Sequence, residues 1–430
     1  MKHIYFVSLG CDKNTVNSEA LIGALTRAGF GVCTDVLDAS AVVINTCGFI
    51  REAVQESIDT ILEFSEGDAP IVVTGCMVNR YREEILKELP EVAAVVSPND
   101  SSTLVAELCR LLGVEGAVYP RTEDYENRIL TTMVGQAYIK IAEGCNHRCT
   151  YCTIPAITGD YKSREPESIL REAVNLAKRG VREVTVVAQD TSCYGADLSP
   201  KTSLAALLTQ ISGVAGIEWI RVMYAYPDNI DDELINVIRD NPKICHYLDV
   251  PIQHASDKVL RLMGRDTTKE SLQALFKKLR EKITDISIRT TIITGFFGEG
   301  KEEFNELLEF VKEVKFDKLG VFEYSEEEGT AALSLGIKAV SEKTREKRKE
   351  EIMLAQQSVS GEILRGKVGT TQKVLVESIR ADGKYVGRTY ADCPELDGNV
   401  IFSSDRTLCV GDFEYVKICA SDFYDLFGSA

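Results

Sequence analysis

The sequence has no uninterrupted apolar run that approaches the roughly 18 residues of a membrane-spanning helix. One of its most apolar stretches, AVVINTCGFI, ends at Arg51 and Glu52. The opening run, MKHIYFVSLGC, looks superficially like a signal peptide, but it is interrupted by Ser8 and Gly10 and lacks a small-residue cleavage site. These absences predict a cytoplasmic protein with no membrane segment.

The chain also lacks an excess of basic residues. It carries 49 Lys and Arg against 66 Asp and Glu, a formal net charge of -17. This balance opposes broad contact with nucleic-acid phosphates and suits a basic partner. The 13 cysteines in 430 residues are too unevenly spaced for a secreted disulfide scaffold. In a reducing compartment, clustered thiols instead indicate metal ligands.

Residues 1–117 alternate short apolar runs with helical patterns. A parallel sheet covered by helices on both faces, Rossmann-like or flavodoxin-like, is therefore predicted. The expected strands are 4–9, 41–45, 70–75 and 93–97, and the expected helices are 17–29, 52–67 and 81–90.

A polar connector within residues 118–133 precedes a second α/β series. Six expected strands alternate with helices over residues 134–365, whereas a closed barrel needs eight strands. The prediction is an open, partial, TIM-like (β/α)6 barrel. Its expected strands are 136–141, 182–188, 218–223, 245–250, 286–293 and 319–324, and its helices 167–180, 203–212, 230–240, 256–283 (broken near Gly264) and 302–315.

The last part of the chain changes character. The charged stretch 341–365 predicts a long helix that packs on the barrel. Residues 366–430 show short alternating strands and turns, which predict a small β-barrel of a kind that often serves as a binding module.

Three cysteines, Cys145, Cys149 and Cys152, form a C-x3-C-x2-C pattern just after the first barrel strand. Reactive groups of such barrels gather at the carboxyl ends of the strands. Three thiolates could hold three irons of a 4Fe-4S cluster and leave the fourth iron open to another ligand. A zinc site that uses His147 is the alternative, although its place between two ligand cysteines makes joint chelation awkward.

Three further cysteines each follow an expected parallel strand: Cys11 in SLGC, Cys47 in INTCGF and Cys76 in VTGCMV. The carboxyl ends of parallel strands meet at one edge of the sheet, where ligands bind in open α/β folds. The pattern predicts a second under-ligated iron-sulfur cluster. The remaining cysteines fit the description of buried small hydrophobic residues: Cys33, Cys109, Cys193, Cys245, Cys393, Cys409 and Cys419.

The C-x3-C-x2-C motif resembles that of the radical S-adenosylmethionine (SAM) superfamily. The resemblance implies that SAM binds the open iron through its amino and carboxylate groups and is cleaved to methionine and a 5'-deoxyadenosyl radical. It also implies that Tyr151 lies against the adenine and that Arg289 pairs with the SAM carboxylate. Other groups stand at strand ends, namely Gln189, Asp190, Tyr224, Tyr226, Gln253, His254, Thr294 and Gly295.

With both three-cysteine sets and a terminal β-barrel, essentially the whole chain resembles the methylthiotransferases. The resemblance implies an amino-terminal methylthiotransferase domain with an auxiliary 4Fe-4S cluster (1–117), a linker (118–133), a radical SAM core (134–365) and an OB-like TRAM domain that binds substrate (366–430). SAM would serve as methyl donor and as radical source. An electron donor such as flavodoxin or ferredoxin is also implied.

Four segments resemble the RimO-like branch, which modifies the β-carbon of an aspartate in ribosomal protein S-twelve of the small subunit: LGCDKNTVNSE, INTCGFIREAVQES, AQDTSCYG and YLDVPIQHASDKVLRLMGR. The MiaB-like branch, which modifies a tRNA adenosine, remains an alternative, as does an iron-sulfur redox-sensing protein that binds ribosomes. Residues 366–430 hold seven basic and ten acidic residues, so nucleic acid is not the expected substrate. One departure is Phe297, which stands where these families usually have proline and predicts a less rigid loop.

Overall fold

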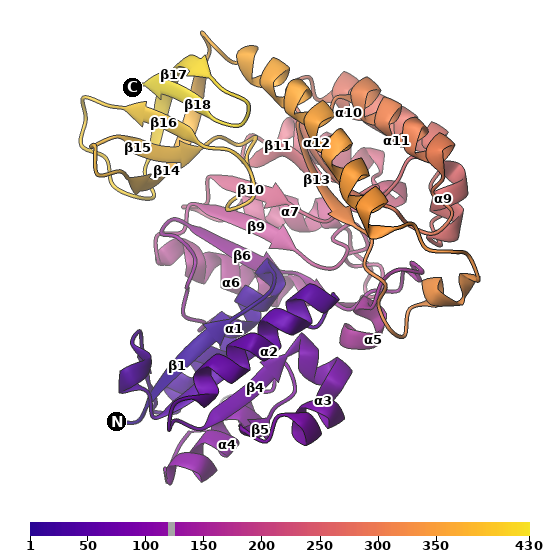
Figure 1. Cartoon of the computed structure of the whole chain (residues 1–430). Coiled ribbons are helices and arrows are strands. Elements are labelled where there is room, and N and C mark those ends of the chain that lie inside the picture. The colour runs from indigo at the N-terminus through magenta and orange to yellow at the C-terminus, as the bar shows by residue number, and fades with distance from the viewer. Residues whose placement is uncertain (119–124) are drawn as a thin grey trace. The chain divides into compact units, whose positions relative to one another are not determined.

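The computed structural model describes residues 1–118 and 125–430 and divides into two compact units (Figure 1). The amino-terminal unit comprises Met1–Thr132, Glu143–His147 and Cys152–Lys162. The core unit comprises Met133–Ala142, Arg148–Tyr151 and Ser163–Ala430. Residues 119–124 of the expected linker lie outside the described part. Within that part, none of the helices combines the length and apolar composition that crossing a membrane requires.

The amino-terminal unit contains a five-stranded parallel sheet in the order β2-β1-β3-β4-β5. This is the flavodoxin-like order, so the predicted fold class is confirmed. The strands are β1 His3–Ser8, β2 Gly31–Cys33, β3 Ala41–Thr46, β4 Ile71–Gly75 and β5 Val92–Val95, and the helices are α1 Asp12–Arg27, α2 Arg51–Ser65, α3 Cys76–Glu88 and α4 Ser101–Leu112.

Helices cover both faces of this sheet. On one face, Leu25 of α1 and Leu108 of α4 pack with strand residues such as Val43. On the other, Ile61 of α2 and Ile85 of α3 pack with strand residues of alternate parity. Because successive strand residues point to opposite faces, the continuous apolar runs in the sequence fill both cores at once.

Residues 125–132, the described end of the expected linker, are fixed to α1. The buried side chain of Arg128 donates to Glu19 of α1 at 2.5 Å. The other carboxylate oxygen of Glu19 accepts from the backbone N–H of Thr131 at 2.7 Å. A buried charge pair of this kind fixes the geometry of a segment because neither charge has water as a substitute partner.

The core unit contains a six-stranded parallel sheet in the order β13-β12-β11-β10-β9-β6, which remains open, as predicted. Its strands are β6 Gln136–Lys140, β9 Glu183–Val187, β10 Trp219–Val222, β11 Ile244–Asp249, β12 Ser287–Thr294 and β13 Lys318–Glu323. Its helices are α6 Pro166–Lys178, α7 Leu204–Ser212, α8 Asp232–Asp240, α9 Asp257–Leu262, α10 Lys269–Lys282 and α11 Lys301–Val314. Short β7 Ala142–Glu143, β8 Lys162–Ser163 and α5 Ile154–Thr158 lie between β6 and α6. The predicted break near Gly264 separates α9 from α10.

The long helix α12 Glu342–Arg365 packs on the core through buried Ile352 and Gln356, whose amide donates to the carbonyl of Phe316. After it, five strands close into a barrel in the order β14-β15-β16-β18-β17 (Figure 1). These strands are β14 Thr371–Ile379, β15 Tyr385–Arg388, β16 Val400–Ser403, β17 Phe413–Ser421 and β18 Leu426–Ser429. Both predictions are confirmed, while β2, α4, β7, α5, β8 and β18 were not predicted.

A buried ion-pair network joins this small barrel to the parallel sheet. Glu183 of β9 accepts from Arg221 of β10 at 3.0 Å and also from Arg388 of β15, which in turn donates to Glu377. Glu183 and Arg221 have no exposed surface. Although burial favours the neutral acid, Arg388 and Arg221 hold the pKa of Glu183 below its ordinary value. Glu183 is therefore the shared counter-charge of two buried arginines.

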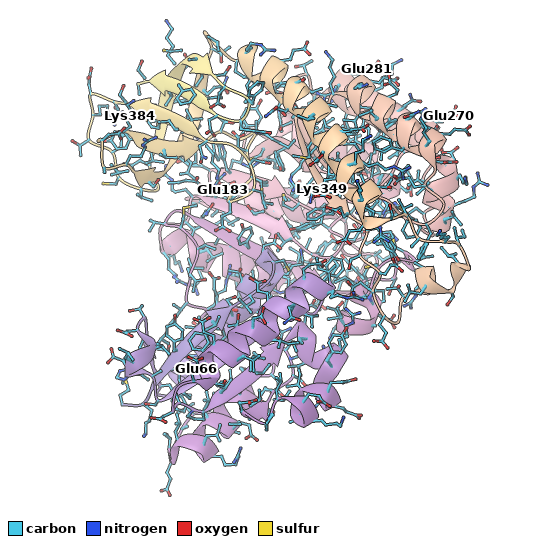
Figure 2. All side chains as sticks on the ribbon, viewed as in Figure 1. Glu66, Glu183, Glu270, Glu281, Lys349 and Lys384 are labelled. Atoms are coloured by element: carbon cyan, nitrogen blue, oxygen red, sulfur yellow. The ribbon has the colours of Figure 1, made fainter. Side chains whose placement is uncertain are left out.

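Replacing Glu183 by glutamine is expected to lower the free energy of unfolding of this junction by about 3 kcal/mol, because two buried guanidinium groups lose their counter-charge. The ring centroid of the sole tryptophan, Trp219, lies 4.7 Å from that of Phe413. The fluorescence of Trp219 therefore reports unfolding of the junction in urea. Glu281→Gln, on the exposed side of α10 (Figure 2), serves as a control and should cost less than about 0.5 kcal/mol. A loss below about 1 kcal/mol for Glu183→Gln would contradict the assigned role.

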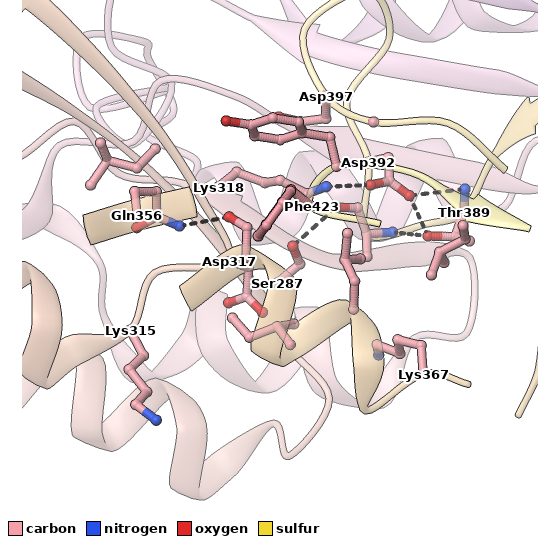
Figure 3. Close-up of a pocket in the computed structure, with 18 of the residues that line it drawn as sticks. Ser287, Lys315, Asp317, Lys318, Gln356, Lys367, Thr389, Asp392, Asp397 and Phe423 are labelled. Carbon is pink, nitrogen blue, oxygen red and sulfur yellow. Dashed lines mark hydrogen bonds and ion pairs between the residues drawn. The ribbon is translucent and has the colours of Figure 1, made fainter. Parts of the chain in front are cut away.

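A pocket of about 820 Å³ lies where the amino ends of β12 and β13 meet α12 and the small barrel (Figure 3). Lys318 pairs with Asp392 at 2.6 Å, and Asp392 also accepts from the hydroxyl of Thr389. Although burial favours the neutral acid, Lys318 holds the pKa of Asp392 below its ordinary value. The pocket lies at the amino ends of these strands, and Asp397, one of its lining residues, approaches Arg289 of the site described next.

Candidate functional site

The three amino-terminal cysteines of the predicted second site stand at the carboxyl ends of adjacent strands. Cys11 lies between β1 and α1, Cys47 directly follows β3, and Cys76 begins α3 immediately after β4. Since β1, β3 and β4 are neighbours in the sheet, the three cysteines occupy one edge. Two of them also stand at helix amino termini, where the helix dipole favours anionic ligands.

Two glycines permit the close approach of these chain segments. A Cβ on Gly10 would lie 3.3 Å from the Sγ of Cys47, and Gly10 has a positive φ of 92°. A Cβ on Gly48 would lie 2.9 Å from the carbonyl carbon of Cys76. The backbone beside each cysteine is therefore in contact with the next cysteine-bearing segment, which explains why glycine flanks them.

Electrostatics also connect the cysteines. Burial raises the pKa of the Cys47 thiol, and the neighbouring Cys11 raises it further. Neighbouring thiolates repel each other unless a cation lies between them. Thiolates are soft ligands that select iron-sulfur clusters, zinc or cuprous copper over calcium or magnesium. The donor set therefore fits the second cluster that the sequence predicted.

Cys145, Cys149 and Cys152 lie on the loop between β7 and α5. Cys145 is buried, and its N–H donates to the carbonyl of Gly159 at 3.1 Å. The preceding Gly144 has a positive φ of 78°, and a Cβ there would lie 2.1 Å from the carbonyl oxygen of Asp160. The entry to the loop thus requires glycine. Three thiols close together in the chain on one loop fit a cluster that leaves one iron open.

The segment after Cys152 lies beside the amino-terminal cysteines, within the same unit. Thr153 donates its hydroxyl to the carbonyl of Phe49, two residues after Cys47, at 3.0 Å. Asn79, three residues after Cys76, donates its amide to the carbonyl of Ile157 at 2.8 Å. The last cysteine of the loop is therefore tethered to the same edge of the sheet that carries the other three.

The segment around Cys149 is fixed within the core unit. Thr150 donates its N–H to the carbonyl of Met263 at 2.9 Å and accepts, through its own carbonyl, the N–H of Ala332. Tyr151 packs edge-on against Phe296, with ring centroids 6.2 Å apart. Phe296 follows the carboxyl end of β12 by two residues, so Tyr151 lies at the end of the barrel where ligands are expected.

Phe297, the residue that departs from the usual proline, is buried and belongs to this aromatic cluster. Its ring lies 5.7 Å from Phe296 and 5.3 Å from Tyr324. The anchored ring restrains the loop by packing, whereas proline would restrain it through its fixed φ. Packing of the Phe297 ring therefore restrains the loop that the sequence predicted to be less rigid.

Arg289 lies on β12 level with the last residue of β11, Asp249, and donates to it at 2.9 Å. Burial raises the pKa of Asp249, although Arg289 opposes that shift. Asp397 of the small barrel lies 3.9 Å from the Nε of Arg289 and accepts from Tyr247. The guanidinium expected to meet the SAM carboxylate is thus already paired with a carboxylate of this chain.

Other residues at the strand ends form local hydrogen bonds or have unusual backbone conformations. Asp190 accepts from Ser192 and, at 3.1 Å, from the Sγ of Cys193. Tyr224 and Gln253, at the carboxyl ends of β10 and β11, have positive φ values of 59° and 68°. Left-handed conformations at such residues are strained and often mark functional sites. This signal is not visible in the sequence.

His254 and Glu299, which are buried, follow β11 and β12, and the Nε2 of His254 lies 3.4 Å from a carboxylate oxygen of Glu299. The Nδ1 of His254 accepts the N–H of Ser256 at 2.9 Å, and Glu299 accepts the N–H of Gly295, the residue after Thr294, at 2.7 Å. These bonds hold the strand-end loops in place.

The expectation for the remaining cysteines is partly wrong. Cys109, Cys245 and Cys393 are buried, but Cys409 and Cys419 are exposed. Cys419 lies on β17, where side chains alternate between the barrel interior and solvent, and the sequence pattern did not settle its side.

Comparison with known proteins agrees with this geometry. Residues 3–97 match "Uncharacterized protein family UPF0004", residues 139–311 match "Radical SAM superfamily", and residues 368–430 match "TRAM domain". The radical SAM match implies a 4Fe-4S cluster and SAM, which counts against the zinc alternative.

The fold resembles that of the radical SAM methyltransferase TsrM from Kitasatospora setae, with a TM-score of 0.57 at 16% identity, covering 87% of this chain and 81% of that one. The likeness in sequence is much stronger to proteins named ribosomal protein uS12 methylthiotransferase RimO. The protein from Clostridium botulinum strain Loch Maree is 46% identical, covering 99% of this chain and 97% of its own. That from Lachnoclostridium phytofermentans is 43% identical, covering 99% of both. The chain therefore belongs to the RimO family of radical SAM methylthiotransferases.

Proposed function

We propose that this protein adds a methylthio group to the β-carbon of an aspartate in ribosomal protein uS12, the protein called S-twelve above. The observation that carries the proposal is the convergence of Cys11, Cys47 and Cys76 on one sheet edge, where Thr153 tethers the loop of the other cysteines. Relatives that match 99% of this chain are named ribosomal protein uS12 methylthiotransferase.

In this proposal Cys145, Cys149 and Cys152 hold the first 4Fe-4S cluster and Cys11, Cys47 and Cys76 hold the second. When bound, the first cluster supplies the electron that cleaves SAM and starts hydrogen abstraction from the substrate carbon. The chain's residues position the reactants: glycine-flanked loops hold the thiols, and the aromatic rings of Phe296, Phe297 and Tyr324 keep water from the strand ends.

The proposal also assigns SAM contacts and domains. Tyr151 lies against the adenine, and Arg289 reaches the SAM carboxylate in competition with Asp249. The domains follow the limits expected from the sequence: 1–117, 118–133, 134–365 and 366–430. Residues 366–430, with a net charge of -3, dock a basic ribosomal protein, and a flavodoxin or ferredoxin supplies electrons.

Three measurements test this function. The anaerobically reconstituted chain should bind about eight irons, whereas about four would discard the second cluster. Incubation with SAM, reductant and a sulfur source should add the mass of a methylthio group to a uS12 peptide. Modification of tRNA instead of the peptide would show that the substrate is a tRNA. The absence of 5'-deoxyadenosine would show that the protein does not cleave SAM to a radical.

Arg289→Lys is expected to raise the KM for SAM about tenfold, because an ammonium cannot reproduce the fork geometry of a guanidinium on a carboxylate. Arg280→Lys, which alters an arginine paired with Asp317 just before the amino end of β13, is the matched control. An unchanged KM for Arg289→Lys would remove Arg289 from the SAM site.

A further inference from the structure

Arg265, three residues beyond the end of α9, is a buried arginine without the carboxylate partner that other buried arginines have. Arg128, Arg221 and Arg388 each pair with a buried or largely buried glutamate. Arg265 is 4% exposed, and no carboxylate of the described residues is among the groups that act on its charge. A buried charge normally has a counter-charge, so an anion is missing from its surroundings.

The contacts of Arg265 leave part of its side chain unsatisfied. Its Nη2 donates to the carbonyl of Pro251 at 3.1 Å, and the guanidinium lies 4.3 Å from the centroid of the Tyr226 ring. Its Nε has no hydrogen-bond partner among the described residues. A buried N–H without a partner remains open to a further hydrogen-bond acceptor.

The segment before Arg265 is attached to both neighbours of Cys149. The hydroxyl of Thr150 donates to the carbonyl of Leu262 at 2.7 Å. A Cβ on Gly264 would lie 3.1 Å from the carbonyl oxygen of Arg148. Arg265 therefore stands directly beside the Cys149 segment, with an arrangement that is fixed by backbone contacts on each side of the cysteine.

The electrostatic surroundings agree with this placement. The side chain of Arg265 hydrogen-bonds that of Tyr151, and Tyr226 and Cys149 are also among its electrostatic neighbours. An arginine guanidinium stays charged at any pH at which a protein is folded.

We propose that Arg265 is a positioning residue whose fixed positive charge lies against the Cys149 end of the first cluster and raises the reduction potential of that cluster. The inference rests on the proposed ligand role of Cys145, Cys149 and Cys152. Reduction adds one electron, supplied by a low-potential one-electron donor, and so increases negative charge at the site. A neighbouring buried cation favours the reduced form because protein surroundings screen it less than water does.

The test uses the full chain with Cys11, Cys47 and Cys76 replaced by alanine, so that only the first cluster is present. Electron paramagnetic resonance of the reduced cluster is followed at a series of fixed solution potentials. Arg265→Gln should lower the ratio of reduced to oxidised cluster about tenfold at a given potential, a shift of about 59 mV for a one-electron couple. Iron content should remain about four per chain.

Two variants separate charge from packing. Arg265→Lys keeps the charge and should change the ratio less than about threefold. Arg261→Gln removes the same charge from an exposed position on α9, one turn earlier, and should leave the ratio unchanged.

An unshifted potential for Arg265→Gln, or an equal shift for Arg261→Gln, would overturn the inference. If Arg265→Gln fails to retain iron, Arg265→Lys decides: an iron-loaded cluster at the original potential supports the charge role, and loss of iron there too assigns Arg265 to packing alone. Failure of the parent triple variant to bind iron would instead refute the proposed ligands.

Discussion

Replacing Cys149 by alanine is expected to lower the formation of 5'-deoxyadenosine from SAM more than about 100-fold. Removing a residue that only supports a metal ligand commonly costs 10- to 100-fold in metal affinity or activity, so removing a ligand itself should cost more. The N–H of Thr150 donates to the carbonyl of Met263, so the conformation of the loop around Cys149 does not depend on the Cys149 thiol. The fold should therefore persist while the first cluster is lost.

Iron and product are measured together in this experiment. The variant should lose about four of its irons, with a far-ultraviolet circular dichroism spectrum like that of the unsubstituted chain. Cys409→Ala removes an exposed thiol outside both sets and is the matched control, with iron and product retained. Full activity of Cys149→Ala would exclude the C-x3-C-x2-C loop as the cluster site.

The elements of the fold that could be predicted are those with long patterns. The strands of the core are apolar runs of four to eight residues between helices with helical periodicity, and each was found in place. Strand β2 is only three residues long, too short to show a period, and β18, with the sequence LFGS, has only two apolar residues. Helix α4 was missed although Asp100 caps it, because its apolar residues follow closely on a predicted strand.

The cluster cysteines could be proposed from sequence for two different reasons. Cys145, Cys149 and Cys152 are close in the chain, so spacing alone relates them. Cys11 and Cys47 are distant in the chain, but each follows a parallel strand. Because the strands could be predicted from their apolar pattern, both cysteines could be placed at the same edge of the sheet.

Other features of the site depend on contacts that no local pattern records. Arg265 meets the Cys149 segment from more than a hundred positions away in the chain. The pairing of Arg289 with Asp249 depends on the register of β11 against β12, which only the structure supplies. The left-handed conformation of Tyr224 is likewise set by its surroundings, since its N–H donates to Asp249.

Replacing Cys47 by alanine is expected to abolish methylthio transfer while SAM is still cleaved. Cys47 follows β3, the central strand of the three, and has Gly10 on one side and the Cys76 backbone near Gly48 on the other. Its loss leaves two thiols on the sheet edge, too few to hold the second cluster. The methylthiolated uS12 peptide should fall more than about 100-fold, while 5'-deoxyadenosine stays within about threefold because the C-x3-C-x2-C loop is intact.

Cys33→Ala is the matched control, because Cys33 also ends a parallel strand of this sheet, β2, but lies outside the three adjacent strands. Iron, 5'-deoxyadenosine and methylthiolated peptide should all be retained in this variant. Equal loss of both products in Cys47→Ala would show that one cluster serves both steps. Retained methylthio transfer would mean that the sulfur does not pass through the edge formed by Cys11, Cys47 and Cys76. Only separate losses agree with two sites of different chemistry, each holding three thiols and leaving one iron open.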